Sequence, residues 1–194
     1  MNTMRRSLTS LNRIGCCLLF LFLLGSCNDD DDNGTPDPEP APNRLELTWG
    51  DPEAIGSTET FTYSNINGAI SSDAIQIETG FYSVQARVLD ASNAGNPIDL
   101  TQDILTQGED YKLFYNYPED VVEFFQYSDF DAVGSPIGIS SGWNVSDPSQ
   151  SGDSIVVRLV QGLDKSLSQN QGNQWTEAVE GEVLLRASFA LNVQ

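Results

Sequence analysis

Apolar and polar residues alternate with a period of two along most of the chain after residue 43. In residues 44–49 (RLELTW) this places Leu45, Leu47 and Trp49 on one face, and residues 182–193 (EVLLRASFALNV) carry the longest such pattern. Alternation is typical of strands that bury one face and solvate the other, which favours antiparallel sheets. Further strands are predicted at residues 58–64, 74–79, 82–88, 111–117, 121–128, 137–143 and 153–160.

The last predicted strand shows the pattern most clearly and helps to define the fold class. One face carries Val183, Leu185, Ala187, Phe189, Leu191 and Val193, opposite Arg186, Ser188 and Asn192. Turn signals such as ASNAGNP and DAVGSP separate the strands, and LTQDILTQG (residues 100–108) is predicted as a short helical turn. Eight or nine strands over residues 44–194 predict an all-β fold, an antiparallel β-sandwich of the immunoglobulin-like type.

The N-terminal segment has the layout of a secretory signal. Three arginines precede the uncharged run IGCCLLFLFLLGS, which ends directly before Cys27. The run is shorter than the roughly 20 apolar residues that span a bilayer. LGSC resembles the lipobox of bacterial lipoproteins, in which the cysteine becomes the acylated first residue. We therefore predict a lipoprotein signal peptide at residues 1–26 and lipidation of Cys27; the alternative is an ordinary cleaved signal peptide.

Residues 27–43 are predicted to be a tether. Four adjacent aspartates repel one another, and TPDPEPAP favours extended polyproline II structure, so this acidic, proline-rich segment should bury nothing. It could reach roughly 50 Å at about 3.1 Å per residue. Cleavage before Cys27 removes the other two cysteines, so the mature chain has no internal disulfide. The β-sandwich domain, residues 44–194, must then rely on burial alone.

Charge and composition restrict the function. The formal charge of −19 becomes −22 when the signal peptide removes three arginines and no acid, so nucleic acid and anionic lipid surfaces should be repelled. The membrane is then a partner only through the lipid anchor. The chain has no histidine, which excludes Ser-His-Asp and Cys-His nucleophiles and imidazole-based metal sites. The composition permits a pair of catalytic carboxylates of the glycosidase kind, but the sequence singles out no such pair. We therefore predict that the protein is not an enzyme.

A candidate calcium site lies in residues 127–136 (YSDFDAVGSP). Asp129, Asp131 and Gly134 form a D-x-D-x-x-G pattern, in which alternate carboxylates can converge on one ion and glycine allows a tight turn. The pattern lacks the third close acid and the distant glutamate of a full EF-hand loop. The alternative is an aspartate-rich turn between strands that binds no ion.

Tryptophans suggest a candidate glycan site. Trp143 and Trp175 lie near predicted strand ends or loops, where an exposed indole can stack on a sugar. Trp175 is the better candidate, because residues 166–181 form a long polar stretch without periodicity, and such loops are often functional. The alternative for either residue is burial in the sandwich core.

Four short motifs are spread over the domain: LTWG, IDLTQDILTQGEDYKLFYNY, SDFDAVGSPIGISSGW and SIVVRLVQGLDK. Together they resemble a group of small Bacteroidota surface lipoproteins of unassigned function. That group has an aspartate-rich tether, a D-x-D-x-x-G-x-P-x-G turn and two histidines, at whose positions this chain has Tyr111 and Gln161. Any activity that depends on those histidines is not expected here. Acids close behind the lipidated cysteine also resemble surface-export signals, which implies the outer leaflet of the outer membrane; the alternative is its periplasmic face.

These observations together predict a non-enzymatic, lipid-anchored surface protein. Its β-sandwich would act as a binding or interaction module, accessory to outer-membrane uptake or to adhesion, with a protein or glycan partner at the cell surface. Two alternatives follow from the candidate sites. The first is a glycan-binding module that uses Trp175, and the second is a structural domain stabilised by calcium at Asp129 and Asp131.

Overall fold

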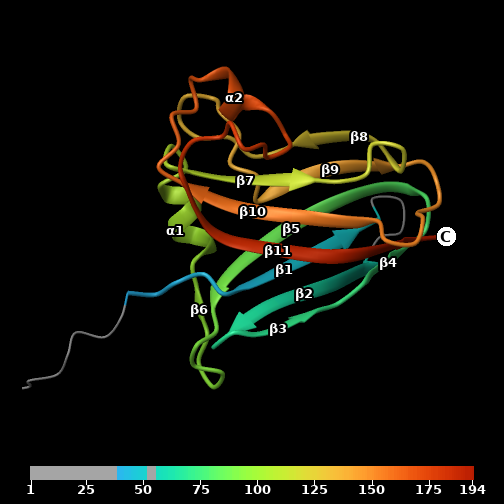
Figure 1. Cartoon of the computed structure of the whole chain (residues 1–194), viewed down its shortest axis with the longest axis horizontal. Coiled ribbons are helices and arrows are strands. Elements are labelled where there is room, and N and C mark those ends of the chain that lie inside the picture. The colour runs from blue at the N-terminus through green and yellow to red at the C-terminus, as the bar shows by residue number, and fades with distance from the viewer. Residues whose placement is uncertain (1–38, 52–55) are drawn as a thin grey trace, which may run out of the picture. The chain divides into compact units, whose positions relative to one another are not determined.

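Two β-sheets contain about half of the residues that the computed structural model describes, which are residues 39–51 and 56–194 (Figure 1). Two short helices, α1 (Thr101–Thr106) and α2 (Ser168–Gln171), lie between strands. The strands are β1 (Arg44–Gly50), β2 (Thr58–Ile66), β3 (Ala69–Ser72), β4 (Ile75–Ile77), β5 (Gly80–Asp90), β6 (Ile98–Asp99), β7 (Tyr111–Asn116), β8 (Val122–Tyr127), β9 (Ser140–Val145), β10 (Ser154–Gln161) and β11 (Glu182–Val193).

The two sheets differ in size and share one core. The larger sheet has the order β3-β2-β1-β5-β9-β8, with β6 paired to β5, and the smaller has the order β4-β11-β10-β7. Leu45, Leu47 and Trp49 are buried on one face of β1, as their alternation predicts. Val157 and Leu159 of β10 belong to the same core from the smaller sheet. The prediction of an all-β sandwich is thus confirmed at this level.

One strand pair departs from the predicted antiparallel arrangement. β4 pairs with β11 in parallel, with Leu191 opposite Ile75 and Val193 opposite Ile77. The chain leaves the larger sheet after β3, adds β4 to the edge of the smaller sheet, and returns to the larger sheet as β5. This crossing places residues 75–77 beside the C-terminal strand, which no local sequence pattern indicates.

The strand β3 is absent from the sequence prediction. All four of its residues are exposed, so it has no buried face to produce an alternating pattern. Its signal is instead the dipeptide before it, because Asn67 and Gly68 both have positive φ, 52° and 81°. A two-residue hairpin of this type requires positive φ at both positions, which asparagine and glycine tolerate best.

A bulge in β11 changes the predicted face of one residue. Leu159 of β10 lies opposite Leu185, but the next residue, Val160, lies opposite Val183, so Leu184 is the extra residue. The prediction that Val183 shares the inner face is therefore wrong, and its side chain is 41 % exposed. Leu184 packs against the core in its place.

Trp143 lies in the centre of the core. It is 2 % exposed, its ring centroid lies 4.7 Å from that of Phe125 and 5.2 Å from that of Trp49, and its Nε1 donates a hydrogen bond to Ser141 Oγ at 2.9 Å. Aromatic pairs at such distances add to the stabilisation from buried area. Trp143 is thus a core residue, which is the alternative that the sequence left open for it.

The first described residues already contact the domain. Ala41 N–H donates to Asp90 Oδ2 at 3.0 Å, and Asn43 Oδ1 accepts a hydrogen bond from Ala91 N–H at 2.7 Å. The last residues of the predicted tether therefore lie against the end of β5. The signal peptide, Cys27 and most of the tether fall outside the described residues.

Candidate functional site

The two aspartates of the D-x-D-x-x-G pattern bind protein groups. The Asp129 carboxylate accepts hydrogen bonds from the backbone N–H groups of Gly138 at 3.0 Å and Ile139 at 2.8 Å. Gly138 has a φ of +96°, and a Cβ atom there would lie 2.8 Å from the Leu113 carbonyl oxygen, so only glycine fits. The N–H groups of Gly138 and Ile139 thus bind the Asp129 carboxylate, and β9 begins only at Ser140 instead of at the predicted residue 137.

Asp131 is paired with a buried lysine. Its Oδ1 accepts hydrogen bonds from the N–H groups of Val133 and Ser135, and its Oδ2 lies 3.1 Å from Lys165 Nζ. Burial alone would raise the pKa of Asp131, but the hydrogen bond from Ser135 and the Lys165 ammonium outweigh it and hold the pKa below its usual value. Lys165 Nζ also donates to the carbonyl of Pro136 at 2.9 Å.

The cation at this turn is thus an ammonium group. Lys165 Nζ also donates to the carbonyl of Gly108, so each of its three protons has an acceptor. Within residues 39–51 and 56–194, no group of three or more acidic, cysteine or histidine side chains is arranged to hold a metal ion. This geometry supports the alternative, a structural turn, and nothing in it favours calcium at Asp129 and Asp131.

A second lysine is buried completely. Lys112 of β7 has no exposed surface, and its Nζ donates to the carbonyls of Asn170 at 2.8 Å and Gly172 at 2.9 Å. The Nζ atom also lies 4.5 Å from the centroid of the Phe114 ring, in a cation–π contact. Burial, with a smaller effect from the charge of Lys165, lowers the pKa of Lys112 to about 8.

Both lysines hold the same part of the chain, which we call the covering segment, residues 162–181. It contains α2 and packs over the outer face of β7 and β10 (Figure 1). Leu163 and Val179 of the covering segment form a small second core with Phe114 and Val160. The long polar stretch of the sequence is thus an ordered cover over the outer face of β7 and β10.

Trp175 lies at the border of the covering segment. It is half-buried against the second core, and the Arg158 guanidinium lies 4.4 Å from the centroid of its ring. Asn116 fixes both residues: its Oδ1 accepts from Arg158 Nη1 at 2.8 Å, and its Nδ2 donates to the Trp175 carbonyl at 3.1 Å. The Arg158 guanidinium therefore already packs over the indole ring, so a sugar that stacked on Trp175 would do so beside an arginine.

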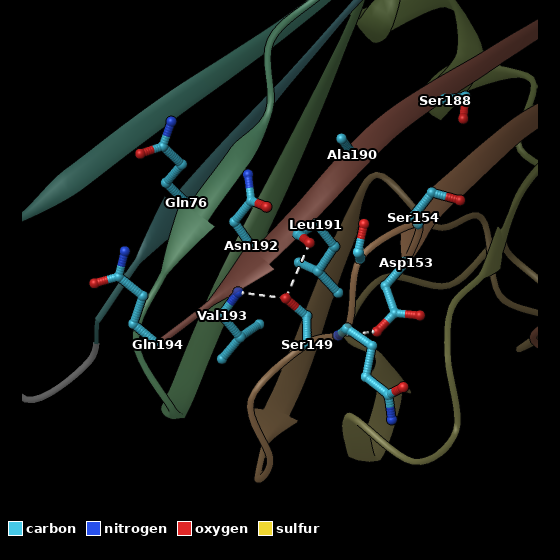
Figure 2. Close-up of a pocket in the computed structure, with 13 residues that line it drawn as sticks. Gln76, Ser149, Asp153, Ser154, Ser188, Ala190, Leu191, Asn192, Val193 and Gln194 are labelled. Carbon is cyan, nitrogen blue, oxygen red and sulfur yellow. Dashed lines mark hydrogen bonds between the residues drawn. The ribbon is translucent and has the colours of Figure 1, made fainter.

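Beyond the covering segment, the same outer face carries an open groove of about 710 Å³ (Figure 2). The strands β4, β11 and β10 form its floor, and residues 149–153 form its rim. Ser149 holds the rim to β11, because its hydroxyl donates to the Leu191 carbonyl at 3.0 Å and accepts from Val193 N–H at 2.8 Å. The volume lies within the usual range for small-molecule sites.

The groove is lined mainly by polar side chains that can form hydrogen bonds but carry no charge. Among the lining residues, the single charged side chain is that of Asp153, which accepts from Gln150 N–H at 2.6 Å. The polar side chains on the floor share a further property, because none of them makes a hydrogen bond with any described residue. They are Gln76, Ser154, Ser188, Asn192 and Gln194 (Figure 2).

Sequence reasoning identified part of this surface. It placed Arg186, Ser188 and Asn192 on one face of the last strand, and that face is the outer face of β11. It could not place Gln76 beside Asn192, because the parallel β4–β11 pair joins residues far apart in the sequence. Trp175 was singled out for its loop, and the structure places it beside Arg158, on the same outer face as the groove.

Comparison with known proteins finds no match, whether with protein-family models, curated proteins or solved structures. No helix within the described residues is long and apolar enough to cross a membrane.

Proposed function

We propose that the chain is a non-enzymatic, lipid-anchored surface protein whose β-sandwich domain binds a glycan in the groove. The observation that carries this proposal is the set of uncharged, unpaired amides and hydroxyls on the groove floor, in a chain whose formal charge is −19. Each saccharide hydroxyl is both a donor and an acceptor, which uncharged amides and hydroxyls match well. Such a module would serve an outer-membrane uptake system or adhesion.

The anchor is the second part of the proposal. Lipidation of Cys27 and an extended tether would hold the domain at the outer membrane, on the cell-surface side, where a glycan is accessible. The resemblance to Bacteroidota lipoproteins and the acids directly behind Cys27 support this location. The immunoglobulin-like type of the sandwich, like the signal peptide, stays a prediction.

A protein partner at the cell surface is the second candidate, and one observation favours it. Phe81 of β5 and Phe124 of β8 are 62 % and 49 % exposed, and both lie opposite Asn144 of β9. Two exposed aromatic rings on the outer face of a sheet are typical of interaction surfaces. This surface belongs to the larger sheet, so variants can separate it from the groove.

Replacing Ala190 with tryptophan should abolish glycan binding and leave the fold intact. Ala190 is exposed on the groove floor, so a large side chain there fills the groove without entering the core. The measurement is binding of residues 28–194 to an array of neutral and acidic oligosaccharides. Ala69→Trp, at an exposed position of β3 in the other sheet, is the matched control and should bind normally.

Two results would contradict the groove as the binding site. The first is an array on which the native domain binds no oligosaccharide. The second is binding that survives Ala190→Trp; if it is lost instead when Phe81 and Phe124 are changed to serine, the aromatic surface is the site.

Replacing Cys27 with alanine should release the protein from the membrane fraction, because the residue that carries the lipid is lost. The measurement is cell fractionation together with metabolic labelling by a fatty acid. Cys17→Ala, inside the predicted signal peptide, is the control and should stay labelled and membrane-bound. Equal labelling of the two variants would count against lipidation at Cys27.

A further inference from the structure

Basic residues are few in this acidic chain, and two of them stand together. After residue 26 the chain has six lysines and arginines. Lys112 and Lys165 are buried, Arg87 makes ion pairs with Glu46 and Asp99 at 3.3 Å and 2.7 Å, and Arg44 is a half-buried residue of β1 in the larger sheet. The arginines on the outer face of the smaller sheet are different. Arg158 of β10 and Arg186 of β11 lie directly opposite each other.

This pair costs stability as it stands. Like charges directly opposite each other in an antiparallel pair are destabilising. Burial lowers the pKa of Arg158 most, and the neighbouring Arg186 charge lowers it further; the second effect reflects the same repulsion. Among the described residues, neither Arg158 nor Arg186 has an acidic partner within ion-pair distance. An anion bound between them would relieve the repulsion.

Arg158 is held in a fixed orientation for such an anion. Its guanidinium packs against the Trp175 ring, and Nη1 donates to Asn116 Oδ1. A guanidinium has five N–H donors, so the remaining ones have no partner among the described residues. Arg186 is exposed, and its side chain makes no hydrogen bond within residues 39–51 and 56–194. The pair thus combines one oriented guanidinium with one that is free to move.

The arginines continue the floor of the groove. Arg186 and Ser188 are two residues apart on β11, and Arg158 and Ser154 are four residues apart on β10, so each pair lies on one face of its strand. At about 3.3 Å per residue, Arg186 is roughly 7 Å along the strand from Ser188, and Arg158 is roughly 13 Å from Ser154. The outer face therefore has neutral hydrogen-bonding groups in the groove and two cations next to it along the strands.

We propose that the groove binds an oligosaccharide that contains a uronic acid, with the sugar carboxylate held by Arg158 and Arg186. This inference rests on the proposed function and names its ligand class. Arginine forks match the planar, two-oxygen geometry of a carboxylate. The neutral groups Gln76, Ser154, Ser188 and Asn192 take the sugar hydroxyls along the rest of the groove.

Other anions fit this face less well. A nucleic acid or another polymer with a charge on every unit would extend over Asp153 and the strongly acidic domain, which repel it. An acidic peptide would need apolar contacts or a free strand edge to add affinity, whereas the groove floor offers mainly amides and hydroxyls. A ligand with isolated charge and many hydroxyls matches the observed pattern.

Arg186→Gln should weaken binding of the acidic oligosaccharide at least about tenfold, because a hydrogen bond to a charged group is lost. The probes are otherwise neutral oligosaccharides that carry one residue of galacturonic, glucuronic or mannuronic acid, each compared with its carboxyl-reduced form by calorimetry on residues 28–194. We expect native binding to an acidic probe and at least tenfold weaker binding to its reduced form. Arg87→Gln, which removes an equal charge from the other sheet, should bind like the native domain.

The outcomes separate this inference from the proposed function. Equal binding of acidic and reduced probes, or full binding by Arg186→Gln, overturns the carboxylate inference while groove binding blocked by Ala190→Trp still stands. Failure of every acidic probe to bind the native domain also overturns it. A poly-glutamate peptide that binds and depends on Arg186 would replace the saccharide with an acidic peptide. The fold of Arg186→Gln is checked by its melting temperature, which should not fall, because the removed charge faced another arginine.

Discussion

Lys165→Met is expected to lower the free energy of unfolding by about 3–5 kcal/mol, the usual cost of breaking a buried ion pair. The side chains of Lys165 and Asp131 are 6 % and 1 % exposed, so the substitution leaves a buried carboxylate without its cation. It also leaves the carbonyls of Gly108 and Pro136 without a donor. Chemical unfolding followed by tryptophan fluorescence measures the change.

A double substitution provides the control for this prediction. Asp131→Asn removes the charge that Lys165→Met would leave unpaired, so the two changes together should cost less than the sum of the single changes. Additive costs, or a single-variant loss below about 1 kcal/mol, would show that the pair contributes little. They would also reopen the question of which cation stabilises this turn.

Lys112 should make the stability depend on alkaline pH. Its pKa is about 8 in the folded chain, against an ordinary value of 10.5, so between these values the unfolded chain holds a proton that the folded chain has released. Stability from this group is therefore lowest below about pH 8 and rises up to pH 10.5. The size of the rise is about 3 kcal/mol.

Comparison with Lys112→Met isolates this effect, since every other titrating group is common to both chains. The native domain should gain about 3 kcal/mol relative to the variant across that interval, measured by urea unfolding at a series of pH values. A constant difference between the two chains would mean that Lys112 keeps its ordinary pKa and that its ammonium is better solvated than its burial implies.

The sequence predicts the strands well because their signal is local. A period of two identifies the inner residues of β1 and the polar outer face of β11, whichever strands lie beside them. The bulge at Leu184 breaks the rule at one point, since an extra residue reverses the faces before it. β3 escapes the rule because it has no buried face, although its Asn-Gly turn was available as a signal.

The candidate sites were harder to predict, because they depend on residues far apart in the sequence. A D-x-D-x-x-G pattern indicates that two carboxylates lie close together. It cannot indicate that Lys165, 34 residues after Asp131, supplies the cation that pairs with one of them. Burial of Lys112 depends on the covering segment, whose sequence is polar and aperiodic. The fact that Arg158 and Arg186 lie opposite each other can be recognised only when the register of β10 against β11 is known. Pairing, more than composition, creates the proposed carboxylate site.

The two buried lysines also determine how partners of this protein can be captured. They are the only lysines in the chain, and Lys112 and Lys165 are 0 % and 8 % exposed. Amine-directed cross-linkers and dyes will therefore find no accessible lysine side chain on the folded domain. Carboxyl-directed reagents have abundant surface targets, since the chain has 28 acidic residues. A search for binding partners that relies on lysine chemistry would miss this protein even when it is bound.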